Sequence, residues 1–333
     1  MITLAPSDDV MVEVRGQVGL ITLNRPKALN ALSLGMVRSL TATLRAWKDD
    51  ADVKAVAIRG STKTGVFGGF CAGGDIRFFH QAALAGNPAL EDFFTEEYAL
   101  NHLIHHYPKP YIAFMDGIVM GGGMGICQGP ALASPAGRTG SAPGKPSARQ
   151  GGVVRLVTEH TKMAMPETNI GLFPDVGGGY FLSRCPGRMG EWLALTGDVI
   201  DGATAVTIGL ADHLVDAARL PEAWEALATL DWSVADPLGV WAAMFSGVAR
   251  ADSTGARGQI DQYFALDSVP SIVRALEADT SEWAQHTAAT LRKRSPLMLH
   301  VVLEQVRRAR HMTLADDLRM ERDMVRHCFF TPH

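Results

Sequence analysis

The sequence predicts an α/β core followed by a helical C-terminal region, and three observations support this fold class. The chain has 333 residues, 47% of them hydrophobic, which is enough to bury the core of one large domain or of two ordinary ones. Strand-like and helix-like segments follow one another in the first part of the chain, which favours a layered α/β architecture. Beyond about residue 217 the segments are helical. We therefore expect a core over residues 1–217 and a helical region over residues 218–333.

The first elements follow from hydrophobic periodicity. A hairpin is predicted over residues 10–26, VMVEVRGQVGLITLNRP, because valines alternate with charged residues and a glycine supplies the turn. A helix is predicted over residues 33–50, where one apolar stripe recurs at helical spacing. Residues 53–60, VKAVAIRG, and residues 111–115 are predicted as buried strands. Strand, helix and strand in this order build the predicted core.

A segment of different composition interrupts the core at residues 129–152. It consists mostly of Pro, Ala, Gly, Ser and Arg, it has no periodicity, and it offers little apolar surface to bury. We interpret it as a disordered, mobile surface loop. The strand pattern returns at residues 153–159, VVRLVTE.

The C-terminal region carries helix signals. PEAWEALATL, residues 221–230, and residues 271–294 have helical patterns. Ser295 followed by Pro296 predicts a helix start, with the serine as the cap and the proline in the first turn. Thr313, three residues before Asp316, resembles a capping box that opens a last helix.

Composition excludes several function classes. The net charge of −4 gives no reason to expect nucleic-acid binding. The four cysteines are scattered without a CxxC pair, so neither a disulfide framework nor a zinc site is indicated. The N-terminus has no apolar core of signal-peptide length, and no run approaches the ~18 apolar residues of a membrane span. We therefore expect a cytoplasmic protein that binds neither membrane nor nucleic acid.

Two glycine-rich stretches each precede a predicted helix. FCAGGDIRFF places Gly73 and Gly74 before Asp75, and DGIVMGGGMGI places Gly121 to Gly123 after a strand. Glycine lets the backbone approach a ligand closely, and the free N–H groups of a helix start favour negative charge. Two such N-termini facing each other could form an oxyanion hole. The alternative is that both stretches are ordinary turns or close-packing glycines.

Other ligand motifs fit poorly. The dinucleotide pattern GxGxxG would need glycine where Ile126 or Gln128 stands, no GxSxG elbow is present, and GKP at residues 144–146 lacks the Ser or Thr of a phosphate-binding loop. His102, His105 and His106 have helical spacing but no acidic partners, which favours a helix face over a metal site. No metal site is therefore predicted.

Two lone carboxylates stand in the apolar stretch AMPETNIGLFPDVGGGY, residues 164–180. Glu167 and Asp175 each follow a proline, and the residues between them are uncharged. They could be a catalytic pair. Alternatively, Glu167 caps a helix or pairs with an arginine, and Asp175 begins a turn.

Six motifs in order make the chain resemble the enoyl-CoA hydratase/isomerase (crotonase) superfamily, and most closely its 3-hydroxyisobutyryl-CoA hydrolase branch. The motifs run from about Gly19 to Val215 and are RPKALNALS, FCAGGDIR, EEYALNHLI, KPYIAFMDGIVMGGGMG, AMPETNIGLFPDVGGGY and LTGDVIDGATAVTIGLADHLV. The resemblance implies a crotonase-like spiral of ββα units, in which residues 129–152 form an insertion.

The resemblance also assigns roles at the site. It implies that the N–H groups of Gly74 and Gly122 bind the thioester oxygen. Hydratases of the superfamily use two glutamates, of which Glu167 is kept, whereas the other position holds Gly125. Asp175 stands where hydratases usually have an uncharged residue, which marks the hydrolase branch. Glu97 matches a substrate-contacting position of that branch.

The implied reaction is hydrolysis of a short 3-hydroxyacyl-CoA thioester, an activity of valine catabolism. Glu167 would attack the carbonyl or activate a water, and Asp175 would position the water or the acyl group. Because two buried acids cannot both ionise freely, one pKa should rise.

The remaining expectations concern binding. The resemblance places the substrate against Lys27, Ala28, Leu29, Gly73 and Asp75, with coenzyme A entering as part of the substrate and no metal or redox cofactor. A homo-oligomer, trimer or hexamer, is compatible with it. Two alternatives stay open: an enoyl-CoA hydratase or isomerase of the same fold, and a non-catalytic acyl-CoA binder.

Overall fold

The computed structural model describes residues 8–132, 151–247 and 255–330. Most of the predicted loop at 129–152 therefore lies outside the described residues. Its described ends pair with each other, since Ala131 bridges to Val153 and the Leu132 N–H donates to the Val153 carbonyl. The chain thus enters and leaves the loop at one edge of the strand that begins at Gly152.

The core is a six-stranded sheet in the order β1-β2-β3-β4-β6-β9. Its strands are β1 Val10–Arg15, β2 Val18–Leu23, β3 Ala55–Gly60, β4 Pro110–Met115, β6 Gly152–Val157 and β9 His213–Leu214. β1 and β2 form the predicted antiparallel hairpin, and the other neighbours pair in parallel. The predicted hairpin and the two predicted buried strands are confirmed, to within three residues at their ends.

A three-stranded sheet in the order β5-β7-β8 lies beside the large one. Its strands are β5 Ile118–Met120, β7 Lys162–Ala164 and β8 Ile200–Asp201. Because β5 directly follows β4 and ends at Met120, this small sheet delivers the GGG stretch to the helix start at Gly122.

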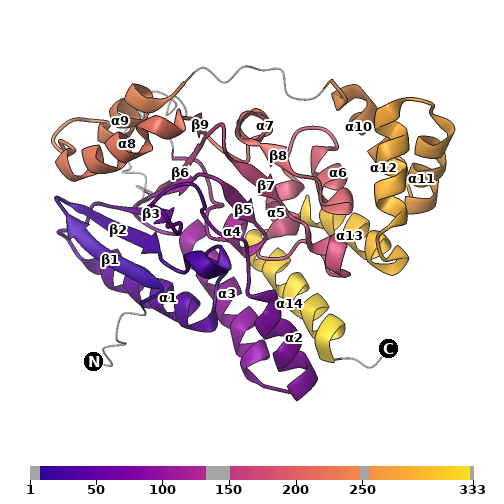
Figure 1. Ribbon diagram of the computed structural model, residues 1–333, viewed down its shortest axis with the longest axis horizontal. Coiled ribbons are helices and arrows are strands. Elements are labelled where there is room, and N and C mark those ends of the chain that lie inside the picture. The colour runs from indigo at the N-terminus through magenta and orange to yellow at the C-terminus, as the bar shows by residue number, and fades with distance from the viewer. Residues whose placement is uncertain (1–7, 133–150, 248–254, 331–333) are drawn as a thin grey trace.

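Both faces of the inner strands β2, β3, β4 and β6 are buried, whereas the edge strand β1 is mostly exposed. Ile21 and Val56 face the main core, which contains α1 Leu34–Asp49 and α3 Ala89–His105. Leu20 and Ala57 face a second core built from α8 Leu220–Ala226 and α9 Pro237–Phe245. Figure 1 shows these two helix pairs on opposite sides of the sheet.

The remaining helices complete the core and continue into the C-terminal region. They are α2 Ile76–Ala85, α4 Gly122–Gly125, α5 Gly178–Leu182, α6 Met189–Thr196, α7 Gly202–Thr207, α10 Arg257–Phe264, α11 Val269–Ala278, α12 Glu282–Arg292, α13 Pro296–Ala309 and α14 Leu314–Phe330. The predicted starts are confirmed, because Ser295 accepts from the Met298 N–H and Thr313 accepts from the Asp316 N–H.

The last helix returns to the core. α14 packs against α3 and α5, and Figure 1 shows it beside α3, far from α10 to α12. In the three described ranges, no helix is both long and apolar enough to cross a bilayer.

Candidate active site

The two predicted glycine stretches lie side by side. The Cys71 N–H donates to the Ile118 carbonyl and the Met120 N–H to the Cys71 carbonyl, so the chain before Gly73 runs parallel to β5. A Cβ atom on Gly122 would stand only 3.3 Å from the Gly74 nitrogen. Both stretches lead into helices, α2 and α4, as predicted.

The N–H groups of Gly74 and Gly122 are available as donors. Neither has an acceptor among the described residues, although the neighbouring Gly73 carbonyl and Asp75 N–H both bond to Leu32. Gly122 is the first residue of α4, where a helix leaves its N–H groups without internal partners. Two free N–H groups this close can share one oxyanion.

Two carboxylates press against the GGG stretch. A Cβ on Gly121 would lie 2.6 Å from Glu167 Oε1, and a Cβ on Gly122 would lie 2.5 Å from Glu97 Oε1. Carboxylate oxygens thus occupy the space of a side chain at both positions, and the φ of +49° at Gly121 also favours glycine there. Glu167 opens the short 3₁₀ helix Glu167–Ile170, and Glu97 is carried by α3. The sequence-predicted Glu97 and Glu167 thus meet at the predicted oxyanion glycines.

Asp175 joins this cluster from the loop between the 3₁₀ helix and α5. The Tyr98 hydroxyl donates a hydrogen bond of 2.8 Å to Asp175 Oδ2. Glu97 Oε1 and Glu167 Oε2 are both buried without a hydrogen-bond partner in the described part of the chain. Buried polar atoms without partners are rare in folded proteins. They indicate a site that a substrate or water completes.

Burial raises the pKa of all three acids of this cluster, and repulsion by neighbouring carboxylates adds to the shift of Glu97 and Glu167. Burial raises the pKa of Glu97 well above its ordinary value, and the charges of Asp175 and Glu167 add to the effect. Burial likewise raises the pKa of Glu167, with the charge of Asp175 contributing. Burial raises the pKa of Asp175 to about 6, against the Tyr98 hydrogen bond, which lowers it. The structure therefore agrees with the expectation of a raised pKa, and extends it to three acids.

Glu167 and Asp175 are only partly exposed. A mostly apolar groove of about 980 Å³ adjoins them, between α2, residues 170–173, α13 and α14. Phe79 of this groove touches the place where a Gly74 side chain would stand, and Phe173 is two residues before Asp175. The groove is large enough for a small-molecule substrate.

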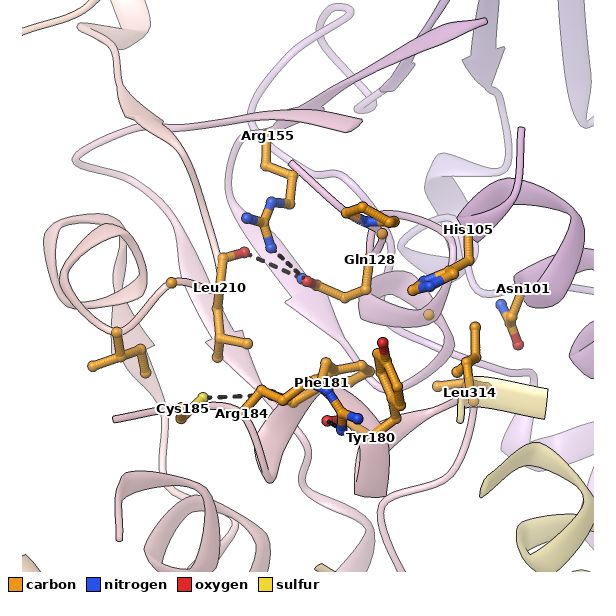
Figure 2. A pocket seen from close by; sticks show the side chains of 16 residues that line it. Asn101, His105, Gln128, Arg155, Tyr180, Phe181, Arg184, Cys185, Leu210 and Leu314 are labelled. Atoms are coloured by element: carbon orange, nitrogen blue, oxygen red, sulfur yellow. Dashed lines mark hydrogen bonds between the residues drawn. The ribbon is translucent and has the colours of Figure 1, made fainter. Parts of the chain in front are cut away.

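A second cavity, of about 220 Å³, is shown with its lining side chains in Figure 2. Gly125, Val176 and Asn101 border it, and its far wall is Arg155, held by Asp212 and Gln128. A Cβ on Gly125 would stand 2.6 Å from the Val176 Cβ and 2.9 Å from Asn101 Nδ2. The space that a second glutamate would need is therefore filled, and a two-glutamate site cannot form.

The other residues that were predicted to contact the substrate, Lys27 to Leu29 and Asp75, lie near the Gly73 turn. The Leu29 carbonyl accepts from the Ala72 N–H, so the segment of Lys27, Ala28 and Leu29 borders the Gly73 turn, although among described residues it lines neither cavity. Lys27 and Leu29 are exposed. The Asp75 carboxylate caps α2 through the Arg77 and Phe78 N–H groups and pairs with Arg25 at 2.7 Å. A substrate contact for Asp75 stays a prediction.

Sequence reasoning missed two residues of the site. Tyr98 reaches Asp175, and Asn101 is 2% exposed with both amide atoms unpartnered among the described residues. Asn101 lies four residues after Glu97, on the same helix face, so this spacing could have identified it.

The histidines at the end of α3 form no metal site among the described residues. His102 and His106 stack with ring centroids 4.2 Å apart, and no group of metal ligands occurs in the described ranges.

The chain matches a known protein family over most of its length. A model described as enoyl-CoA hydratase/isomerase matches residues 18–133 and 148–333, so the chain belongs to that family. The gap in the match falls within the segment predicted as an insertion. The predicted crotonase-like α/β fold is confirmed, since the structure of a carnitinyl-CoA dehydratase from Mycobacterium thermoresistibile has a TM-score of 0.82 at 39% identity, over 98% of this chain and 87% of that one.

Two curated relatives are similar to this chain over most of its length, and both are 3-hydroxyisobutyryl-CoA hydrolases. The mitochondrial 3-hydroxyisobutyryl-CoA hydrolase of Xenopus tropicalis is 39% identical over 94% of this chain and 76% of its own length. That of Danio rerio is 36% identical over 98% of this chain and 81% of its own. The resemblance stated from six motifs is thereby confirmed.

The prediction of a cytoplasmic protein is wrong by this comparison, since these relatives are mitochondrial. Scattered cysteines indicate reducing surroundings, which more than one compartment provides.

Proposed function

We propose that this protein is an acyl-CoA thioester hydrolase that releases coenzyme A from 3-hydroxyisobutyryl-CoA or a similar short 3-hydroxyacyl-CoA. The observation that carries the proposal is that Glu167 lies beside the Gly74 and Gly122 N–H groups, which have no acceptor among the described residues. Tyr98 holds Asp175 close by, and a Cβ on Gly125, where hydratases carry their second glutamate, would clash with Val176. The curated relatives of the same name support the choice of substrate.

The reaction proceeds in this geometry as a sequence of simple steps. The thioester oxygen accepts hydrogen bonds from the Gly74 and Gly122 N–H groups, which stabilise the negative charge as it develops. Ionised Glu167 either attacks the carbonyl carbon itself or takes a proton from an attacking water. The C–S bond of the tetrahedral intermediate then breaks, and the thiolate of coenzyme A takes up a proton. If Glu167 was the nucleophile, this step leaves an acyl–Glu167 anhydride, which a water molecule hydrolyses to the free acid and the Glu167 carboxylate. Water supplies the oxygen of the free acid.

The cluster of Glu97, Glu167 and Asp175 can accept and donate the protons that this reaction moves. Burial disfavours the charged form of its members, and the charge of Asp175 raises the pKa of Glu97 and of Glu167 further. One carboxylate can therefore act as base or nucleophile while a neighbouring carboxylic acid keeps a proton for the leaving thiolate. Asp175, held by Tyr98, orients the water or the acyl group, and Glu97 hydrogen-bonds the substrate 3-hydroxyl. Hydrolysis moves no electrons between redox states, so the proposal includes no redox cofactor.

The proposed path of the substrate uses the surfaces described above. The apolar groove between α2 and α14 receives the acyl end or the pantetheine arm, and exposed Lys27 meets a phosphate of coenzyme A. A trimer or hexamer stays a prediction. A place in valine degradation follows from the proposed substrate.

The test is a substrate panel. Purified protein is given 3-hydroxyisobutyryl-CoA, 3-hydroxypropionyl-CoA, acetyl-CoA and crotonyl-CoA, and thiol release and double-bond hydration are both followed. We expect thiol release from the two hydroxyacyl thioesters and little hydration of crotonyl-CoA. Efficient hydration without thiol release would support the hydratase alternative, and tight acyl-CoA binding with no turnover would support a non-catalytic binder.

A rapid quench distinguishes the two roles of Glu167. If Glu167 is the nucleophile, mass spectrometry of acid-quenched protein during turnover detects an acyl group on the peptide that contains it. If Glu167 is a general base, no such adduct accumulates, and free acid appears with the first turnover.

A further inference from the structure

The loop that carries Asp175 is tied to the C-terminal helices by three buried side chains. Glu321 Oε2 accepts from the Gly177 N–H at 2.7 Å and its Oε1 from the Gly179 N–H at 3.1 Å, while Asp317 Oδ2 accepts from the Tyr180 N–H at 2.7 Å. Gln305 Nε2 donates to the Pro174 carbonyl at 2.6 Å and to Glu321 Oε1 at 3.2 Å. Asp175 is thus bracketed on both sides by anchored backbone.

The three anchoring side chains are fully buried. Glu321 and Asp317 are 0% exposed and Gln305 is 1% exposed. A Cβ on Gly179 would lie 2.6 Å from Asp317 Oδ1, and a Cβ on Gly177 would lie 2.8 Å from Leu314 Cδ1. The glycines after Asp175, Gly177 to Gly179, therefore permit α14 to approach the loop. This third glycine stretch has a packing role and, unlike the first two, no part in the oxyanion hole.

The loop also needs an anchor because its backbone is unusual. Val176 has φ of +54° and Gly177 has φ of +84°, so two successive residues lie in the left-handed region. A β-branched residue rarely adopts this conformation, which persists only where surrounding contacts impose it. The conformation of Val176 fixes the direction in which the preceding Asp175 leaves the backbone.

The anchoring pair is also within electrostatic reach of the site. Burial raises the pKa of Glu321 well above its ordinary value, and the charges of Asp317 and Asp175 add to this. Burial raises the pKa of Asp317 to about 6, against hydrogen bonds from Glu321 and the Tyr180 N–H and the charge of Arg184. Both shifts favour the protonated form of the pair, in which the repulsion between its two carboxyl groups is smaller.

We propose that Asp317 and Glu321 of α14 are positioning residues that hold the loop 174–180 and thereby orient Asp175 in the acid cluster. The proposal rests on the proposed function, in which Asp175 orients the water or the acyl group. The chain after residue 313 is then part of the catalytic apparatus, although no residue of α14 is proposed to perform the chemistry.

The first test does not depend on activity. Hydrogen exchange of the peptide spanning residues 174–182 is compared in the full-length wild type, Glu321→Ala and Asp323→Asn, a matched loss of an acid from the solvent face of the same helix. We expect exchange in this peptide to be at least ~10-fold faster in Glu321→Ala alone. Unchanged protection in a folded Glu321→Ala protein would overturn the anchoring.

The second test is a double-mutant cycle on thiol release from 3-hydroxyisobutyryl-CoA. We expect Glu321→Ala to lower kcat by ~10- to 100-fold with little change in KM, because a shift of ~1 Å in a catalytic group costs about this much. In the Asp175→Asn background the same change should cost less than about 3-fold, since the group it positions is gone. Equal losses in both backgrounds would overturn the positioning role.

Glu321→Gln keeps the cycle informative if the alanine variant does not fold. It retains one acceptor oxygen, so we expect a smaller loss of kcat that again disappears in the Asp175→Asn background. A wild type that releases no coenzyme A, together with faster exchange in Glu321→Ala, would overturn the proposed function and leave the anchor standing.

Discussion

Replacing Asp175 by asparagine should stabilise the protein at neutral pH while slowing the reaction. Burial raises the pKa of Asp175 from 3.8 to about 6. The folded state therefore binds a proton more tightly than the unfolded chain, so the wild type loses stability as pH rises from about 4 through 6. Asparagine has no charge to bury and keeps an oxygen that accepts the Tyr98 hydrogen bond.

The magnitude follows from the difference between the folded and unfolded pKa values. About two pKa units correspond to about 3 kcal/mol above pH 6, and the partial exposure of Asp175 makes this an upper bound. For 333 residues, an unfolding entropy of about 2.1 cal/mol/K per residue converts up to 3 kcal/mol into a gain of about 2–4 °C in Tm.

The assay is thermal unfolding of the wild type, Asp175→Asn and the exposed control Asp323→Asn at pH 4 and pH 7.5. We expect the Asp175→Asn gain at pH 7.5 only, and no change in the control at either pH. Thiol release should fall in the same variant, since functional sites are maintained at some cost in stability. An Asp175→Asn protein no more stable than the wild type at pH 7.5 would refute the account of a charge that burial destabilises.

Three further predictions follow from the site. Gly125→Glu should not gain crotonyl-CoA hydration and should lower Tm by an amount corresponding to about 1–3 kcal/mol, because its side chain meets Val176; hydration in this variant would contradict the packing argument. Tyr98→Phe should raise the pKa of Asp175, because it removes a hydrogen bond to the charged form, and should move the acid limb of the pH–rate profile to higher pH. An acid limb at the wild-type pH would show that Tyr98 does not affect catalysis through Asp175. Gly122→Pro removes an oxyanion donor and should cost ~10²–10³-fold in kcat, provided that circular dichroism shows a folded protein; a normal rate would assign the oxyanion elsewhere.

The sequence predicted the core elements because they depend on local patterns. The stripe from Met36 to Trp47 is buried as a period of 3.6 requires, and Ser33 caps its helix. The strands at residues 55–60 and 110–115 are buried on both faces, so their near-continuous apolar runs were readable.

Long-range placement could not be predicted from local patterns. The helices α8 and α9 pack on the far face of the sheet, whereas α14 returns to the loop after Asp175 across more than a hundred residues of sequence. Glu321 and Asp317 resemble ordinary acids of an amphipathic helix, and only the fold shows that they are fully buried. The role of Tyr98 likewise depends on a distant segment, because its hydroxyl donates to Asp175, 77 residues away in sequence.

The measurement that tests the central claim most directly is thiol release from saturating 3-hydroxyisobutyryl-CoA by the wild type and by Glu167→Gln. Glutamine keeps the volume beside Gly121 but can act neither as nucleophile nor as base. The account predicts rapid release by the wild type, a loss of ~10²–10⁴-fold in the variant, and unchanged acyl-CoA binding by calorimetry. Near-normal release by Glu167→Gln would contradict it, because the hydrolysis would then not depend on the carboxylate at the centre of the site.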